Sequence, residues 1–278
     1  MTKIKAACVQ MRSGVEVAPN IAAASALIRE AAGQSAKFIA TPEMTNLLDI
    51  RPGMARPKIV EQDDIPLHSF QALAAELGVT LLIGSIAVTL PDDERFANRS
   101  FLIGPDGGVI AHYDKIHMFD VEVGDGQNYR ESRAYRPGEA AVLARAPFGE
   151  IGMTICYDLR FPHLYRRLAQ AGASILTIPA AFTRVTGEAH WHVLIRARAI
   201  ETGCFVIAPA QGGKHEDGRE TFGHSLIVSP WGEVIAEAED AEPGIVLAEL
   251  DLDEVAKARG RIPSLGNDRD IAITRLGG

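Results

Sequence analysis

The sequence is poor in cysteine and has no long apolar run. Only three of the 278 residues are cysteine, Cys8, Cys156 and Cys204, and they form no Cys-x-x-Cys pair. An odd number at this spacing provides neither a disulfide framework nor a structural zinc site. No segment approaches the roughly 18 apolar residues of a membrane span, and the N-terminus lacks the apolar core and cleavage site of a signal peptide. We therefore expect a cytoplasmic protein that does not contact membranes.

Positive charge is also scarce. The chain carries 28 Lys and Arg residues against 36 Asp and Glu residues, so its formal net charge is −8. A nucleic-acid surface needs clustered Lys and Arg side chains that neutralise phosphates, and no nucleic-acid partner is expected here. An acidic protein also repels an anionic substrate at long range, so recognition of a carboxylate would depend on local arginines.

No Ser/Gly-rich or Pro-rich linker divides the chain. The nearest candidate, residues 51–57, is too short for a linker and is interpreted as a loop. The hydrophobic content of 47% is sufficient for a core at this length. We therefore expect a single domain over residues 1–278.

Short β-branched runs alternate with helical stretches along the chain. The pattern predicts helices at 20–32, 64–77, 162–171 and 188–201, and strands at 4–10, 38–41, 79–90, 99–103, 151–156, 174–178, 205–209, 226–229 and 245–250. Turn sequences at 105–108 (Pro-Asp-Gly-Gly) and 230–232 (Pro-Trp-Gly) indicate hairpins. Because a doubly wound sheet would show mainly βαβ crossovers, hairpins mixed with helices favour an α/β fold with two mixed sheets and helices outside.

Cys156 is the most informative residue, because an apolar run delivers its thiol to a turn that opens a helix. A thiol with the ordinary pKa of about 8.5 is only a few per cent thiolate at neutral pH, so a catalytic cysteine needs a base and a positive neighbour. Glu43 and Lys115 each close or follow an apolar run and could supply them. Cys8 and Cys204 instead lie inside apolar runs and are expected to be small buried hydrophobes.

Glu43, Lys115 and Cys156, with the sequences around them, resemble the triad of the nitrilase (carbon-nitrogen hydrolase) superfamily. The resemblance extends from the first predicted strand to the Arg-Ile-Pro-Ser-Leu segment that begins at residue 261, and it implies a four-layer αββα sandwich. It also implies that Glu43 is the general base, that Lys115 lines the oxyanion site with the backbone N–H of Tyr157, and that Cys156 forms a thioester. Glu131 matches the second family glutamate, which supports the lysine and positions the substrate.

The segments 179–201 and 223–232 resemble the amidase branch that includes deaminated glutathione amidase and ω-amidase, and the residues after the cysteine differ from the Trp-Glu pair of true nitrilases. This resemblance implies hydrolysis of the terminal amide of an α-keto acid, with deaminated glutathione preferred, to a carboxylate and ammonia. The alternatives are an ω-amidase acting on α-ketoglutaramate, an N-carbamoyl amino acid hydrolase, and a catalytically silent interaction protein. Arg160, Thr183 and Arg184 are the candidate contacts to the substrate carboxylate.

The helix expected at 188–201 carries two histidines and an arginine that need an interpretation. His190 and His192 point to different faces because they are two residues apart, and no His-Glu-x-x-His motif is present, so we expect no metal and no cofactor. Arg198 lies four residues after the apolar Leu194, which predicts a partly buried side chain with a carboxylate partner.

The C-terminal tail from about residue 261 is the last expected feature. In the resembled family such tails commonly cross a dimer interface, which implies a homodimer or a higher homo-oligomer with the tail extending to the partner. The ending Gly-Asn-Asp-Arg-Asp departs from the basic ending that is usual in the family.

Overall fold

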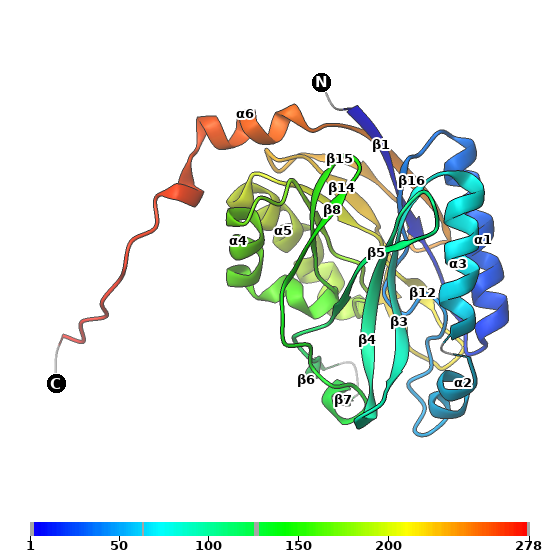
Figure 1. Ribbon diagram of the computed structural model, residues 1–278. Coiled ribbons are helices and arrows are strands. Elements are labelled where there is room, and N and C mark those ends of the chain that lie inside the picture. Colours follow the sequence, from blue (N-terminus) through cyan, green and yellow to red (C-terminus); the bar gives the residue numbers. More distant parts are fainter. Residues whose placement is uncertain (1–2, 63, 125–127, 277–278) are drawn as a thin grey trace.

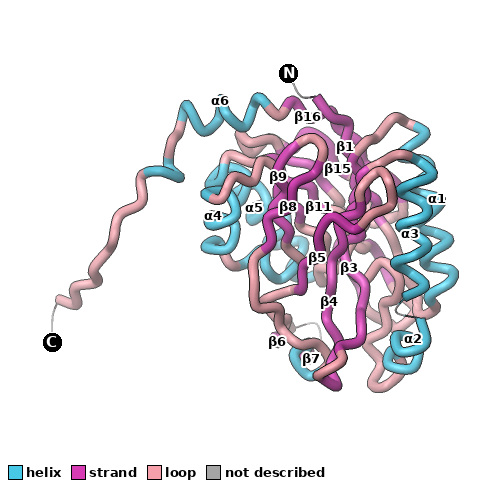
Figure 2. Tube along the Cα trace, viewed as in Figure 1, coloured by secondary structure: helices cyan, strands magenta, loops and turns pink. Residues whose placement is uncertain are grey.

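The computed structural model of the protein describes residues 3–62, 64–124 and 128–276. Two six-stranded mixed sheets lie face to face, and helices cover their outer sides (Figures 1 and 2). The predicted four-layer αββα sandwich is therefore confirmed. None of the helices described in these residues is long and apolar enough to cross a membrane.

Both sheets use the same order of strand pairing. The first sheet is, in spatial order, β16 (Gly244–Asp251), β1 (Lys3–Gln10), β2 (Phe38–Ala40), β3 (Thr80–Leu90), β4 (Asp93–Ile103) and β5 (Val109–Asp114). The second is β8 (Val142–Ala146), β9 (Gly149–Met153), β10 (Ile175–Thr177), β11 (Phe205–Ala208), β14 (Leu226–Val228) and β15 (Val234–Glu237). In each sheet the pairings run antiparallel, parallel, parallel, antiparallel, antiparallel. The two sheets are therefore built alike.

The helices bury one side against the sheets. On the first sheet lie α1 (Val17–Gly33) and α3 (Asp64–Leu77), whose Ile28 and Phe70 are fully buried in the outer core. On the second sheet lie α4 (Pro162–Gln170) and α5 (Arg184–Thr202). The remaining helices are α2 (Ala55–Gln62) and α6 (Asp253–Arg261), with the short 3₁₀ helices η1 (Glu131–Arg133), η2 (Cys156–Arg160) and η3 (Ser264–Gly266).

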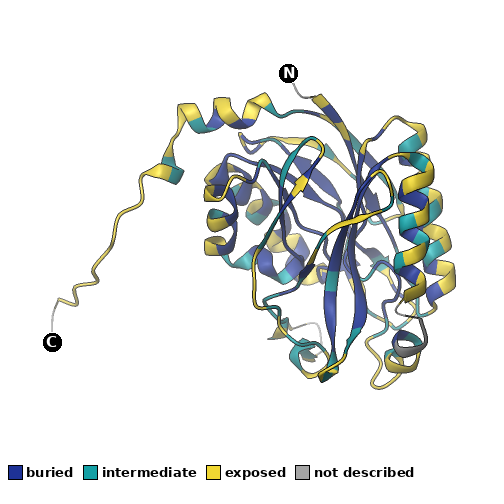
Figure 3. Cartoon of the chain, in the orientation of Figure 1, coloured by how far each residue is buried: buried dark blue, intermediate teal, exposed yellow. Residues whose placement is uncertain are grey.

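The central core lies between the two sheets. It joins residues of the first sheet, such as Phe38 and Leu82, to residues of the second, such as Ile151 and Val206. Figure 3 shows these strands as buried and the outer faces of the helices as exposed. Two hairpins lie outside the sheets: β6 (Asp120–Glu122) pairs with β7 (Asn128–Arg130), and β12 (Gly212–Lys214) pairs with β13 (Glu220–Phe222). The central sheets therefore form a rigid support, and the loops at their strand ends carry the polar residues described below.

Several predicted boundaries differ from the structure, and three of the differences have an identifiable reason. Residues 51–57 were expected to be a loop, but α2 begins at Ala55, and Pro57 falls in its first turn, where a proline removes no helical hydrogen bond. The helix expected from residue 188 begins at Arg184 and includes Gly187. The glycine is needed there for close packing and does not end the helix, because a Cβ at this position would lie 2.3 Å from the Phe222 side chain. The strand expected at 151–156 ends at Met153, because Cys156 has a left-handed backbone.

The predicted environment of Arg198 is confirmed. Its side chain is buried, and Nη1 lies 3.0 Å from a carboxylate oxygen of Glu201. Nε and Nη2 donate hydrogen bonds of 3.0 and 2.8 Å to the backbone oxygen of Leu159. The arginine therefore joins α5 to η2.

The C-terminal tail leaves the body of the molecule after α6 (Figure 1). Arg166 of α4 pairs with Asp268 and donates a second hydrogen bond to the backbone oxygen of Ser264. Beyond this attachment Ile271, Ile273 and Leu276 are almost fully exposed. Apolar side chains with this exposure are suited to contact another surface.

Candidate active site

Cys156 is the first residue of η2, at a sharp turn after β9. Its φ of +48° is in the left-handed region that non-glycine residues rarely adopt. The backbone N–H of Cys156 donates a 2.9 Å hydrogen bond to Pro179, which holds this turn against the loop after β10. The turn directs the thiol to the wall of a cavity, where the residue keeps 6% exposure, whereas Cys8 and Cys204 are completely buried.

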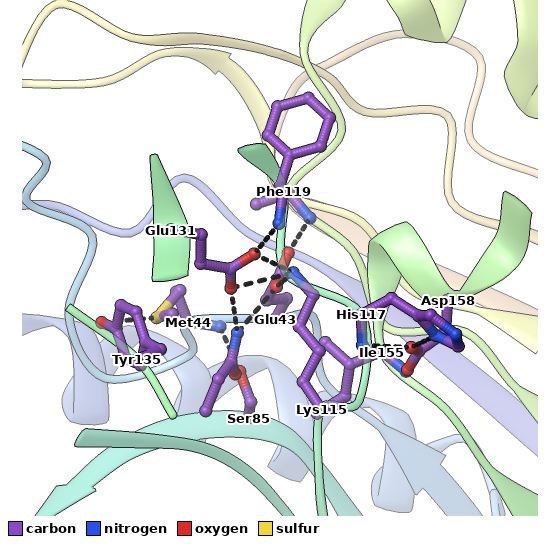
Figure 4. A network of polar contacts seen from close by, with 12 residues as sticks. Glu43, Met44, Ser85, Lys115, His117, Phe119, Glu131, Tyr135, Ile155 and Asp158 are labelled. Carbon is purple, nitrogen blue, oxygen red and sulfur yellow. Dashed lines mark hydrogen bonds and ion pairs between the residues drawn. The ribbon is translucent and has the colours of Figure 1, made fainter. Parts of the chain in front are cut away.

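Asp158 fixes this turn from behind. Its buried carboxylate accepts hydrogen bonds from the Tyr113 hydroxyl at 2.7 Å and the Ile155 backbone N–H at 2.9 Å. The other carboxylate oxygen lies 2.7 Å from His117 Nδ1 and accepts the His117 backbone N–H at 3.1 Å (Figure 4). Since Tyr113 and His117 flank Lys115 in the sequence, Asp158 ties the cysteine turn to the segment that carries the lysine. The sequence analysis missed this role.

Lys115 lies at the centre of a buried ionic network (Figure 4). Its ammonium is 2.8 Å from Glu43 Oε1 and 2.9 Å from Glu131 Oε2. The Asn98 side-chain amide donates to both carboxylates, at 2.9 Å to Glu43 and 3.1 Å to Glu131. Ala181 donates its backbone N–H to the second oxygen of Glu43 at 2.9 Å. The structure thus brings together the predicted residues and adds Asn98, which the sequence analysis missed.

Both sheets contribute to this network. Glu43 follows β2 and Lys115 follows β5 of the first sheet, whereas Cys156 follows β9 of the second. Glu131 begins η1, and its Oε2 also accepts the backbone N–H of Phe119 at 2.7 Å. Every group except the cysteine is therefore held by at least two hydrogen bonds, which fixes its position before a substrate binds.

The charges of the network set the protonation states. Burial acts to raise the pKa of Glu43, but the charge and hydrogen bond of Lys115, with smaller effects of Cys156 and Arg219, lower it below its ordinary value. Burial acts to lower the pKa of Lys115, yet Glu131 and Glu43 hold it well above its ordinary value. Burial and the Glu43 charge raise the pKa of Cys156 far above that of a free thiol. At neutral pH the site therefore contains a carboxylate, an ammonium and a protonated thiol, and the thiol depends on Glu43 as its base.

The cavity beside the network has a volume of about 550 Å³. Among the described residues its lining contains six cationic side chains and three carboxylates: Arg51, Arg56, Lys115, Arg130, Arg133, Arg219, Glu43, Asp49 and Glu131. The rest of the lining includes the aromatic rings of Phe119, Tyr129 and Tyr135. A cationic cavity in a chain of net charge −8 attracts anionic ligands locally while the whole surface repels them.

The three expected carboxylate contacts have different positions. Thr183 lines the cavity, and its hydroxyl is 2.8 Å from that of Thr186. Arg184 is not among the lining residues; it is exposed and pairs with Glu188 at 2.9 Å and with Glu220 at 3.3 Å. The structure therefore brings Thr183, but not Arg184, to the cavity.

Arg160 lies behind the cavity wall. Its guanidinium is 5.2 Å from the ring centre of Phe182, which lines the cavity, and 5.9 Å from that of Tyr157. Its Nη1 is 3.2 Å from His190 Nδ1. The backbone N–H of Tyr157, expected at the oxyanion site, is in the first turn of η2, where N–H groups lack partners within the helix.

A group of three titratable side chains lies outside the cavity lining. His192 Nε2 is 2.6 Å and His224 Nδ1 is 3.2 Å from the same oxygen of Glu237, and the ligand atoms of all three lie within 4.8 Å of one another. Only His190 and His192 are close enough in the sequence to suggest a pair, because residues 224 and 237 are distant in the chain. None of the three contacts the Lys115 network, and the expectation of metal-free catalysis stays a prediction.

Comparisons with known proteins agree with this architecture. The sequence profile of a family described as "Carbon-nitrogen hydrolase" matches residues 5–260. A deaminated glutathione amidase of Synechocystis sp. is 40% identical over 266 residues, which cover 94% of this chain and 96% of that protein. A deaminated glutathione amidase of Yersinia enterocolitica is 37% identical over 275 residues, covering 98% and 95%. The crystal structure of the C. elegans NitFhit protein matches with a TM-score of 0.91 and 32% identity, over 97% of this chain and 66% of that one.

Proposed function

The chain belongs to the carbon-nitrogen hydrolase family, and from this premise we propose that it hydrolyses the amide bond of deaminated glutathione through a thioester on Cys156. The observation that carries the proposal is the position of Glu43, Lys115 and Cys156 together in the wall of a cationic cavity. The enzyme is a carbon-nitrogen hydrolase of the amidase type. The substrate and the role of each residue are the proposed parts.

In the proposed mechanism the Cys156 sulfur attacks the amide carbonyl carbon while Glu43 takes the thiol proton. The Lys115 ammonium and the Tyr157 backbone N–H stabilise the negative oxygen of the tetrahedral intermediate. Glu43 then gives its proton to the leaving amine as the C–N bond breaks and a thioester remains. Glu43 next removes a proton from water, which attacks the thioester carbonyl carbon. The C–S bond then breaks, and Glu43 returns the proton to the sulfur, so that the carboxylic acid leaves and the thiol is restored. Glu131 acts by holding Lys115 in place.

The expected release of ammonia needs a correction for this substrate. In deaminated glutathione the scissile amide nitrogen belongs to the cysteinyl residue, so the amine that leaves is cysteinylglycine. Only a primary amide such as α-ketoglutaramate releases ammonia. Both substrates give 2-oxoglutarate, which is therefore the product to measure when the two are compared.

The cavity supports the larger substrate. Its volume of about 550 Å³ falls in the range of roughly 300–1,000 Å³ that holds drug-sized ligands. Deaminated glutathione carries one carboxylate on each side of the scissile bond, whereas α-ketoglutaramate carries one. The surplus of arginines in the lining favours the ligand with more negative charge.

We expect a higher kcat/KM for deaminated glutathione than for α-ketoglutaramate, and negligible turnover of nitriles. Because the attraction is electrostatic and partly exposed to solvent, KM should rise with ionic strength while kcat changes little. The measurement is a side-by-side assay of 2-oxoglutarate formation at several salt concentrations. Equal or reversed preference would identify an ω-amidase, and preference for an N-carbamoyl amino acid would remove the chain from this substrate class.

We further propose that the protein forms a homodimer. One face of α5 exposes Val185, Val193 and Ile200, and the tail exposes Ile271 and Ile273. Apolar residues in such numbers on one helix and one tail are suited to contact a second copy of the chain. Light scattering should give twice the chain mass of 29.9 kDa, and a monomer at micromolar concentration would contradict the proposal.

A cytoplasmic location is also proposed. All three cysteines are free thiols and all are buried, which suits a reducing compartment. The proposed mechanism needs Cys156 in its thiol form.

A further inference from the structure

Arg219 is a cavity residue whose guanidinium has no anionic partner among the described residues. It lies on the β12–β13 hairpin, and its guanidinium carbon lies over the Tyr129 ring, 5.8 Å from the ring centre. Nη2 donates to the backbone oxygen of Ala181, and Nε is buried without any hydrogen-bond partner. Since an arginine has five donors in a fixed arrangement, most of them stay available to a ligand.

Of the other arginines of the cavity, two have a carboxylate partner and two are exposed to solvent. Arg51 pairs with Asp49 at 2.8 Å and Arg130 pairs with Glu122 at 2.8 Å. Arg56 donates to the backbone oxygen of Glu94, and Arg133 is exposed to solvent. Arg219 is therefore the partly buried arginine of the described lining that forms no direct ion pair with a carboxylate. Withdrawing a charge from water without a partner is costly, so an anion that completes this site would bind favourably.

Arg219 is also joined to the catalytic network. The same residue, Ala181, accepts a hydrogen bond from Arg219 and donates its backbone N–H to Glu43. Without Arg219, the two carboxylates of Glu43 and Glu131 would outnumber the single ammonium of Lys115, and an anionic substrate would meet net negative charge. The guanidinium removes this excess beside the reacting groups.

We propose that Arg219 binds the α-carboxylate of the keto-acid part of the substrate and so makes the enzyme selective for anionic amides. This inference rests on the proposed function and identifies a specificity residue for it. In an α-ketoglutaryl group the carboxylate carbon is four carbon–carbon bonds, each of about 1.5 Å, from the scissile carbonyl carbon. One end of such a group can therefore meet Cys156 while the other end meets the free donors of Arg219. A bidentate contact of this kind needs the planar guanidinium, and a lysine would replace it only in part.

The test compares an anionic amide with a neutral one of nearly the same shape. In 4-oxopentanamide a methyl group replaces the carboxylate of α-ketoglutaramate. Both amides release ammonia, so the same ammonia assay measures both reactions. Arg219→Gln should lower kcat/KM for α-ketoglutaramate roughly 10- to 100-fold, mainly through KM, as expected for loss of a hydrogen-bonded charge. The same variant should change kcat/KM for 4-oxopentanamide less than threefold. Arg219→Lys should recover part of the loss.

The control is Arg145→Gln, which removes an exposed arginine that pairs with Glu150 and is not part of the cavity lining. It should leave kcat/KM unchanged for both substrates. Equal losses for both amides would show that Arg219 only supports the fold, and equal use of both amides by the wild type would exclude a carboxylate site. If Arg219→Gln fails to fold, the test uses the ratio of kcat/KM for the two amides in the wild type and in Arg219→Lys. A ratio that is the same in both proteins would contradict the proposal. Absence of any amide hydrolysis by the wild type would instead contradict the proposed function.

Discussion

Replacing Cys156 with alanine should abolish amide hydrolysis while leaving the fold intact. No other thiol reaches the cavity, since Cys8 and Cys204 are fully buried elsewhere. The change removes one small atom, and the turn is held by backbone bonds that do not depend on the thiol, such as Cys156 N–H to Pro179. We therefore expect no detectable 2-oxoglutarate from deaminated glutathione and a nearly unchanged unfolding temperature.

Cys156→Ser should be nearly as inactive. The pKa of Glu43 is lowered by Lys115 despite the opposing effect of burial, so its carboxylate is a weak base and cannot deprotonate a hydroxyl effectively. The matched control is Cys8→Ala, which removes a buried thiol outside the cavity and should keep full turnover. Activity within tenfold of the wild type in either Cys156 variant would end the thioester mechanism.

Three members of the network could be predicted from the sequence, because each closes or follows a short apolar run. Glu43, Lys115 and Cys156 follow β2, β5 and β9, and in a sandwich of two sheets such strand ends approach one another. Glu131 could be predicted only from the family resemblance, since it stands in a polar segment. The structure places its carboxylate within 3.0 Å of Lys115.

The supporting residues could not be found from the sequence for a physical reason. Asn98 lies in β4 and Asp158 in η2, and each acts through partners that are distant in the chain. Their role follows from burial, because a buried polar group needs hydrogen-bond partners at specific positions. The pattern of apolar residues predicts which side of one helix or strand is buried. It does not predict which other helices or strands pack against that side.

The positions of the arginines could not be predicted from the sequence for a related reason. Arg184 was expected at the substrate, yet acidic residues on its own helix and on β13 neutralise it outside the cavity. Arg219, from a hairpin that the sequence did not predict, reaches the cavity instead. The short strands β12 and β13 contain only three residues each, too few for an alternating pattern to be recognised.

Lys115→Ala should lower kcat by roughly 10²- to 10³-fold, the usual effect of losing one oxyanion donor. The loss should appear in kcat because the negative charge on the substrate oxygen develops only in the transition state. Lys115→Arg should lose less, since it keeps a positive charge. The control Lys257→Ala removes an exposed lysine that pairs with Glu254 and should leave kcat unchanged.

The same variant should shift the pH dependence, which separates a role in catalysis from one in folding alone. In the wild type the pKa of Glu43 lies below its ordinary value, because Lys115 outweighs the effect of burial. Without the ammonium, Glu43 faces Glu131 across the Asn98 amide, so burial and repulsion both raise its pKa. The base is then protonated at a higher pH, and the acidic limb of kcat/KM should move upward. Leaving the buried Glu43 and the partly buried Glu131 without their cation should also cost about 3–5 kcal/mol of folding free energy, measurable by urea denaturation. A raised KM with unchanged kcat and an unmoved acidic limb would place Lys115 in substrate binding instead.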